Sequence, residues 1–399
     1  MKTNVSRILT GLILAATAAS AQTTPPAKET VAPATPPPRA AGFKAGEIAP
    51  PLAVAEWVKG APIPQLAKGK VYLVEFWATW CGPCIGNIPH LNSLQKKYGK
   101  DGLVVVGFSN PDVALGEETK RKENNTLEMV RAFVAGRGDR MDYHVAYDTP
   151  DKATYKSWMN TQGGIPHAFL IDREGRLAVN YHPFYMDDAV RQVLAGTWDH
   201  ATGYPRLRRS SALYGTVLGA KTYAEFQAGY GEMEKEFPFI ARRMLDSKFD
   251  RARLARDEPQ FTATALALLV AAREEGDAAQ LVAIVRGQLS PPAPARLQEL
   301  PAQATPEIRE RIEAANIRAR QRVEDEKTAL KLPLDMLAQM ADAACEITAN
   351  TDPAALSAKA RVARARGDAP AAVALLRQAV ALSSDRERPA YETQLAELK

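Results

Sequence analysis

The distribution of hydrophobic and polar positions predicts strands and helices that alternate over residues 42–198. Three short apolar runs, at residues 70–77, 103–108 and 167–171, suit strands that are buried in a sheet. A turn at 172–175 leads to a fourth expected strand at 177–181, the hairpin partner of the third. Helices are expected at 83–98, 127–135, 152–159 and 187–194. This alternation is typical of an α/β fold.

The pattern changes after about residue 199, where the strand signals stop and Ala, Leu, Arg and Glu dominate. A long polar helix is predicted at 307–330, with Thr305 as its cap and Pro306 in its first turn. The sequence therefore predicts a second, all-α helical domain over residues 199–399.

Two stretches of this second region, 265–289 and 355–382, each place a Gly-Asp dipeptide between apolar helical runs. In the second stretch, apolar residues fall where a tetratricopeptide repeat places its packing residues; they are Ala360, Ala363, Ala372, Leu376 and Ala379. A regular solenoid needs about three such units. We therefore expect an irregular helical domain with tetratricopeptide-like hairpins, which is either a protein-interaction surface or a packing partner for the first domain.

The first 41 residues have the composition of a targeting segment and a linker. Lys2 and Arg7 precede an apolar stretch at 8–19, which is too short to cross a membrane because about 20 residues are needed. A small-residue cleavage site ends this stretch at Ala21, so residues 1–21 are predicted to be a signal peptide. The mature protein is then expected to be soluble and exported, in the periplasm or beyond. The Pro-rich residues 22–41 are predicted to form a disordered linker.

The overall composition is that of a soluble globular protein. Of the 399 residues, 46% are hydrophobic and 24% are charged, and the formal net charge is only +5. There is no basic stripe with interleaved aromatic residues, which argues against a nucleic-acid partner.

Two of the three cysteines, Cys81 and Cys84, follow a predicted strand and start a predicted helix. The start of a helix stabilises a thiolate through unpaired N–H groups and a partial positive charge. Pro83 suits the first turn because it has no N–H to leave unpaired. We expect Cys81 to be the exposed nucleophile and Cys84, on the same helix face, to be the resolving thiol.

Other uses of this cysteine pair fit the sequence less well. A structural zinc site needs four ligands, yet only Cys345 remains and there is no paired-histidine motif. A c-type haem site requires His where Ile85 stands, and a static disulfide usually closes a longer loop. Cys345 is expected to be a small buried residue on an apolar helix face rather than a third redox thiol. No metal is predicted, and four histidines without ligand spacing are interpreted as surface or packing residues; they are His90, His144, His182 and His200.

Three features carry a resemblance to a known family. They are Trp80-Cys81-Gly82-Pro83-Cys84 after a buried strand, Pro89 five residues later, and Gly164-Ile165-Pro166 leading into Phe169-Leu170-Ile171-Asp172 and Gly175. Together they resemble the thioredoxin superfamily, most closely its exported TlpA/ResA-like branch, over about residues 43–198. The resemblance implies an α/β thioredoxin-like fold, with a central mixed sheet flanked by helices. It also implies a redox-active disulfide between the two cysteines, with no cofactor. Pro89, which lacks the N–H for a helical hydrogen bond, is expected to kink its helix.

The resemblance also implies a substrate-binding region. In the family, the residue that matches Pro166 is a cis proline beside the cysteines, and Ile165 would present its backbone to substrate. Trp80 is expected to form part of an exposed apolar rim. His167 departs from the Thr expected in relatives, and we interpret it as a strand residue that faces its neighbours rather than as a titrating group.

Glu75 interrupts the apolar strand six residues before Cys81. Burial of a carboxylate is costly and raises its pKa. Such a carboxyl could accept the proton that Cys84 must lose before it attacks a mixed disulfide. The thioredoxin family has a buried Asp in the matching place. The alternative is that Glu75 turns to solvent at a strand end or pairs with a lysine.

The sequence thus predicts an exported thiol–disulfide oxidoreductase that reduces protein disulfides through its CGPC dithiol. Gly82-Pro83 matches the dipeptide of the reducing thioredoxins, which favours a reductase. The expected partners are protein disulfide substrates, a membrane thiol donor and a protein partner of the helical domain. One alternative is a scaffold protein that selects partners with its helical half. Another is a thiol-dependent peroxidase. It is disfavoured because Ala78 stands three residues before Cys81, where the peroxiredoxin pattern has a Thr.

Overall fold

The computed structural model describes residues 44–111, 125–159, 164–301 and 303–398. The signal peptide predicted at 1–21 and the linker predicted at 22–41 lie outside these residues. Within the described ranges, no helix combines the length and the apolar character that crossing a membrane requires.

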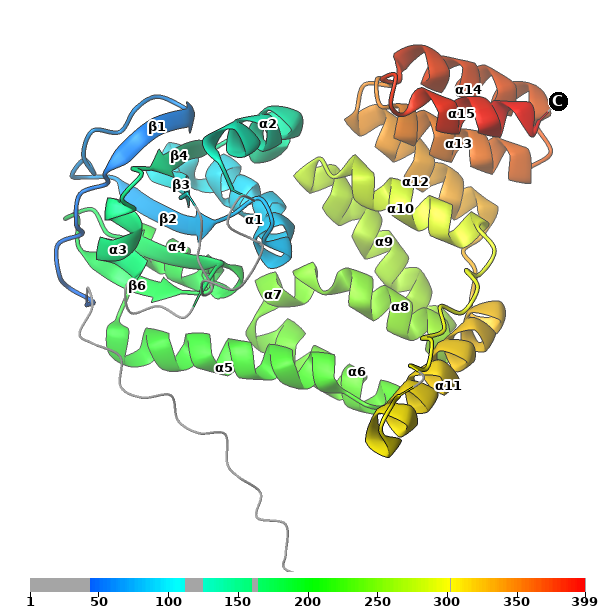
Figure 1. Ribbon diagram of the computed structural model, residues 1–399, viewed down its shortest axis with the longest axis horizontal. Helices are drawn as coiled ribbons and strands as arrows, with labels where there is room; N and C mark the ends of the chain where they lie inside the picture. The colour runs from blue at the N-terminus through cyan, green and yellow to red at the C-terminus, as the bar shows by residue number, and fades with distance from the viewer. Residues whose placement is uncertain (1–43, 112–124, 160–163, 302, 399) are drawn as a thin grey trace, which may run out of the picture. The chain divides into compact units, whose positions relative to one another are not determined.

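A mixed sheet forms the centre of the α/β region (Figure 1). Its described strands are β1 (Val54–Lys59), β2 (Val71–Trp77), β3 (Leu103–Ser109), β4 (His144–Asp148), β5 (His167–Ile171) and β6 (Leu177–Tyr181). They lie in the order β1-β4-β3-β2-β5-β6, and β2 pairs in parallel with β3 and antiparallel with β5. The four strands expected from the sequence are confirmed.

The sequence pattern missed β1 and β4, which pair antiparallel at one edge of the sheet. In β1, Glu56 and Lys59 interrupt the apolar run. An edge strand tolerates such residues because it is covered on fewer sides. β4 has polar residues at both ends, His144 and Asp148, and only three apolar residues between them, so its apolar run is shorter than those of β2, β3 and β5.

Helices cover both faces of the sheet. α1 (Gly82–Tyr98), α2 (Leu127–Arg137) and α4 (Asp187–Leu194) pack on the face that carries Leu73, whereas α3 (Ala153–Met159) packs on the face that carries Phe76. All seven residues of β2 are buried between these layers. Because side chains alternate along a strand, Glu75 points to the same face as Leu73, the face covered by α1.

The helices of this region agree with those expected from the sequence to within two residues at each end. Pro89 lies inside α1, and the helix continues beyond it to Tyr98. The kink expected at Pro89 stays a prediction.

The rest of the described chain is helical, as the sequence predicted. Its helices are α5 (His200–Gly219), α6 (Tyr223–Glu236), α7 (Pro238–Arg243), α8 (Leu245–Ala255), α9 (Glu258–Glu275), α10 (Ala278–Leu289), α11 (Pro306–Thr328), α12 (Leu334–Ile347), α13 (Pro353–Ala365), α14 (Ala369–Leu382) and α15 (Arg388–Ala396). All the described residues belong to one compact unit, and the domain boundary expected at 198 stays a prediction.

Both predicted helical hairpins form, α9 with α10 and α13 with α14. In each, the Gly of the Gly-Asp dipeptide adopts a left-handed conformation, with φ of +70° at Gly276 and +81° at Gly367. The following Asp277 and Asp368 then accept a backbone N–H of the next helix through their side chains. The assignment of these hairpins to tetratricopeptide repeats stays a prediction.

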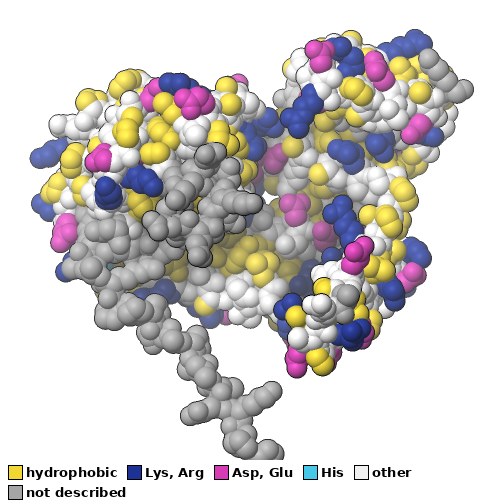
Figure 2. Space-filling view, in the orientation of Figure 1, with side chains coloured by type: hydrophobic (Ala, Val, Ile, Leu, Met, Phe, Trp, Pro, Cys, Tyr) yellow, Lys and Arg dark blue, Asp and Glu magenta, His cyan; other side chains and the backbone are white. Residues whose placement is uncertain are grey.

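The long polar helix predicted after Thr305 is α11, and the Thr305 hydroxyl accepts the N–H of Ile308 as its cap. Within α11, Ile312 is the buried residue. Figure 2 shows basic and acidic side chains mixed over this helix. Its exposure explains why charged residues dominate its sequence.

Candidate redox-active site

Cys81 and Cys84 form a disulfide between the end of β2 and the start of α1. Their sulfur atoms are 2.02 Å apart, and their Cα atoms are 5.2 Å apart. Cys81 is the N-cap of α1, and its Sγ accepts the backbone N–H of Cys84 with an N–S distance of 3.2 Å. Gly82 and Pro83 occupy the first two helical positions.

The position of the Cys81 sulfur suits thiol–disulfide chemistry. A helix begins with N–H groups that have no intrahelical partner, and the aligned peptide dipoles add a partial positive charge there. Sγ of Cys81 already accepts one of these N–H groups. In the reduced protein, the same donors would stabilise a thiolate at Cys81, the form that attacks a disulfide.

The burial of the two cysteines corrects one expectation. Cys84 is fully buried, as expected for a resolving thiol, but Cys81 is only 4% exposed. Cys81 packs in the hydrophobic cluster on the α1 face, against which the half-buried Trp80 and Ile165 also pack. These apolar neighbours explain why the oxidised Cys81 is sheltered rather than openly exposed.

Glu75 is 1% exposed in the middle of β2, so the alternative of a solvent-facing side chain is wrong. Burial raises its pKa well above the usual range. Its Oε1 atom has no hydrogen-bond partner among the described residues, and no lysine there forms an ion pair with it. Glu75 shares the sheet face of Leu73 and Trp77, the face on which both cysteines pack.

The peptide bond between Ile165 and Pro166 is cis, as the resemblance implied. Ile165 packs against the hydrophobic clusters of both sheet faces. His167 begins β5, where it pairs in register with Phe76 of β2, which fits its interpretation as a strand residue.

Comparison with known proteins identifies the fold family of this region. Residues 61–189 match the Redoxin family model. This segment is called the Redoxin domain below, after the family model that it matches. Protein FixW of Rhizobium leguminosarum is 25% identical over 176 residues, which cover 44% of this chain and 76% of FixW. The thiol-disulfide oxidoreductase ResA of Bacillus anthracis is 30% identical over 112 residues, which cover 28% of this chain and 53% of ResA.

Among solved structures, a thiol:disulfide interchange protein of the thioredoxin family from Chlorobium tepidum is 27% identical. The match covers 37% of this chain and 98% of the other, with a TM-score of 0.28. The matches to the Redoxin family model and to ResA confirm the resemblance of this domain to ResA-like thiol–disulfide oxidoreductases. The chain spans about half the length of ResA, at 53%.

A hydrogen-bond network that the sequence did not reveal holds the segment between β2 and the cysteines of the Redoxin domain. Oδ1 of the buried Asn125 accepts both the backbone N–H and the hydroxyl of Thr79, at 2.9 and 3.0 Å. Nδ2 of Asn125 donates to Ser109 Oγ and to the Asn110 carbonyl. The segment that leads into Cys81 is thereby fixed to the end of β3.

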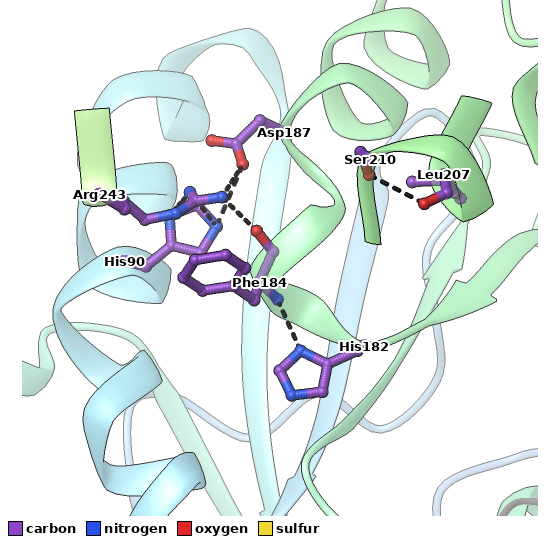
Figure 3. A network of polar contacts seen from close by, with 7 residues as sticks. All are labelled: His90, His182, Phe184, Asp187, Leu207, Ser210 and Arg243. Carbon is purple, nitrogen blue, oxygen red and sulfur yellow. Dashed lines mark hydrogen bonds and ion pairs between the residues drawn. The ribbon is translucent and has the colours of Figure 1, made fainter. Parts of the chain in front are cut away.

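A second network joins the Redoxin domain to α7 (Figure 3). Arg243 donates to Oδ2 of Asp187 at 2.7 Å and to Nδ1 of His90 at 2.8 Å. It also donates to the Phe184 carbonyl, and its guanidinium lies over the Phe184 ring. Burial and the charge of Arg243 lower the pKa of His90 to about 4. His90, expected at the surface or in packing, is therefore a buried member of a charged cluster.

The remaining polar candidates lie outside the redox site. Cys345 is buried in α12 within a separate hydrophobic cluster, and burial raises the pKa of its thiol. It is the small buried residue that the sequence predicted. The described part of the chain has no group of His, Cys, Asp or Glu side chains arranged to hold a metal ion.

Proposed function

We propose that the Redoxin domain reduces protein disulfides with the dithiol of Cys81 and Cys84. The observation that carries this proposal is the disulfide at the start of α1, in which Sγ of Cys81 accepts a helix N-terminal N–H. Cys81 thus occupies the position in which a thiolate is stabilised. The printed name of ResA, a thiol-disulfide oxidoreductase, supports the same reaction class.

The reaction starts from the reduced dithiol. The Cys81 thiolate attacks one sulfur of the substrate disulfide, the substrate S–S bond breaks, and the other substrate sulfur leaves as a thiol after taking up a proton. Cys84 then loses its proton and attacks Sγ of Cys81, which releases the second substrate thiol. Two electrons pass to the substrate, and the chain ends with the disulfide seen here. A dithiol protein, such as a membrane thiol donor, returns the two electrons.

Glu75 is proposed to accept the proton of Cys84 in the second step. Its carboxyl is buried on the same sheet face as the cysteine cluster, and no described cation competes for it. A base for a buried thiol must itself be in a water-poor place and have a pKa near the working pH. Glu75 is buried and therefore meets the first condition. The groups around its carboxyl determine whether its pKa lies near the working pH.

The substrate is proposed to lie over the apolar residues next to Cys81. Trp80 and Ile165 are half-buried and pack on the cysteine cluster, so each keeps a surface for an incoming peptide. The cis bond before Pro166 turns the chain just ahead of β5.

We further propose that the protein is exported, on the strength of the signal-like residues 1–21, and that its helical region binds a protein partner.

A measurement of the reduction potential of Cys81 and Cys84 tests this function. The purified chain is equilibrated in a dithiothreitol or glutathione series while its tryptophan fluorescence is followed, because Trp77 and Trp80 adjoin the cysteines. A two-electron transition near the thioredoxin value of about −270 mV supports a reductase. A value near about −120 mV would make the protein an oxidant, and the absence of any transition would overturn the enzyme proposal.

Single substitutions provide the matched controls. Cys81→Ser should abolish reduction of a model disulfide, whereas Cys84→Ser should leave the chain trapped in a mixed disulfide that is visible by mass spectrometry. Cys345→Ser should leave both reactions unchanged, since Cys345 belongs to a different hydrophobic cluster.

A further inference from the structure

The residues beside Glu75 in the sheet leave space next to its carboxyl. Glu75 lies in register with Gly107 on β3 and with Ala168 on β5. Residues in register point to the same face of a sheet, so the carboxyl has one neighbour without a side chain and one with a methyl group. The empty position at Gly107 must be filled from elsewhere in the fold.

Two aromatic side chains fill this position. A Cβ atom built on Gly107 would lie 3.1 Å from Nε1 of Trp77 and 3.1 Å from Cε2 of Tyr143. The polar edge of the indole and the phenol ring therefore both cover Gly107, directly beside Glu75. Tyr143, which immediately precedes β4, is 4% exposed.

Each of these three side chains has a buried polar atom that lacks a hydrogen-bond partner within the described residues: Glu75 Oε1, Trp77 Nε1 and Tyr143 Oη. A buried polar atom without a partner is costly, and native proteins seldom retain one unless it serves another state of the molecule. Here the two donors, Trp77 Nε1 and Tyr143 Oη, and the acceptor, Glu75 Oε1, are grouped beside Gly107. Two donors suit an ionised Glu75 carboxylate, which is formed only during the reaction.

The charged and titratable groups around Glu75 come from three directions. Cys84 packs from α1, Tyr143 lies before β4, and Arg137 at the end of α2 acts on Tyr143. Burial first, and then the charge of Glu75, raise the pKa of Tyr143, while Arg137 opposes the shift. Gly107 and Ala168, from β3 and β5, do not titrate.

We propose that Tyr143 is a positioning residue for Glu75, whose hydroxyl donates a hydrogen bond to the Glu75 carboxylate, with Trp77 Nε1 as the second donor. The inference rests on the proposed role of Glu75 as the base for Cys84. A fully buried carboxyl without donors stays protonated and cannot accept a proton. Donors that bind the ionised form lower its pKa towards the working pH. Gly107 makes the arrangement possible by leaving room for both rings.

The test uses the full reduced chain and an aryl disulfide, 5,5′-dithiobis(2-nitrobenzoic acid), as substrate. Cys81 forms a mixed disulfide and releases one coloured thiolate, and attack by Cys84 releases the second. The pH midpoint of the second release reports the base. In Tyr143→Phe, we expect the midpoint to rise by about one pH unit, so that the rate below the midpoint falls about tenfold. Tyr155→Phe removes a hydroxyl from the other face of the sheet, so it should leave the pH midpoint and the rate of the second release unchanged.

The outcomes separate this inference from the function on which it rests. Loss of the second release in the unmodified chain would overturn the proposed function itself. A normal second release with the same midpoint in Tyr143→Phe would overturn only the role of Tyr143. A second comparison guards against a structural effect. In a Glu75→Gln background, Tyr143→Phe should produce no further shift, and an equal shift in both backgrounds would refute the inference.

Discussion

Arg243 on α7 donates a hydrogen bond from Nη2 to Oδ2 of Asp187 on α4, across 2.7 Å. The same guanidinium donates to His90, which lies on the helix that starts with the redox cysteines. A single side chain from the helical region thus binds α1 and α4 together. Its charge is needed there because Asp187 is largely buried, and burial of an unpaired carboxylate is costly.

Arg243→Met should lower the free energy of unfolding by about 2–4 kcal/mol, because it leaves the carboxylate of Asp187 without its main partner. The pKa of His90 should rise in the variant, since Arg243 now lowers it and Asp187 would remain beside it. Urea unfolding and an NMR titration of the His90 ring measure both effects. Arg191→Met, which removes an exposed ion pair with Asp188, is the control and should cost less than about 1 kcal/mol. An unchanged His90 titration in Arg243→Met would contradict this account of the cluster.

Folding stability should fall as the solution is acidified from about pH 6.5 to about pH 4. The pKa of His90 is about 4 in the folded protein, below its usual value of 6.5. Between these two values the unfolded chain binds more protons than the folded one, so stability rises with pH across this window and is constant above it. The contribution of His90 is at most about 3 kcal/mol. Chemical unfolding at several pH values measures it, and His90→Gln should flatten this part of the profile. An equally steep profile in His90→Gln would assign the effect to other groups.

Asn125→Ala should destabilise the chain by about 2–3 kcal/mol and slow its reaction with a model disulfide. The substitution removes the acceptor for Thr79 and the donor to Ser109 and Asn110, and it leaves buried polar groups unpaired. Thermal unfolding and the rate of the Cys81 reaction are the two measurements. Asn316→Ala removes similar hydrogen bonds to Gln298 at an exposed position and should have little effect on either. A loss of stability without any loss of rate would show that the network does not position the cysteines.

Gly367→Ala should cost about 1 kcal/mol of stability, because Gly367 has a φ of +81° that an L side chain adopts with strain. No neighbouring heavy atom lies within 4 Å of an added Cβ, so strain rather than a clash is the cause. Gly287→Ala, inside α10 and equally free of contacts, should instead stabilise the chain by about 0.5–1 kcal/mol. Chemical unfolding of the two variants tests the contrast, and a change of the same sign in both would argue against it.

Where the structure follows from neighbouring residues, the sequence predicted it closely. The Thr305-Pro306 cap of α11 and the Gly-Asp turns at Gly276 and Gly367 lie where they were expected. Capping and left-handed turns depend on side chains within four residues of each other, so their physics is contained in a short window. The start of α1 at the two redox cysteines is predictable for the same reason.

The edge of the sheet was less predictable. β1 and β4 pair with each other across a long sequence separation, and their pairing has register shifts at two places. Neither strand has the continuous apolar run of β2: β1 lies at the edge of the sheet, where such a run is not required, and β4 has only three apolar residues between His144 and Asp148. Their existence depends on a partner strand rather than on their own residues.

The amino-acid sequence by itself determined the position of the redox cysteines on a strand–helix junction, the helical hairpins and the presence of a carboxyl at Glu75. The tertiary structure decided that this carboxyl is buried, that Tyr143 and Trp77 meet beside it over Gly107, and that Arg243 joins His90 to Asp187. Local elements follow from contacts between near neighbours along the chain. Burial, pKa and hydrogen-bond partners depend on residues that are distant in the sequence, so only the packed fold brings those groups together.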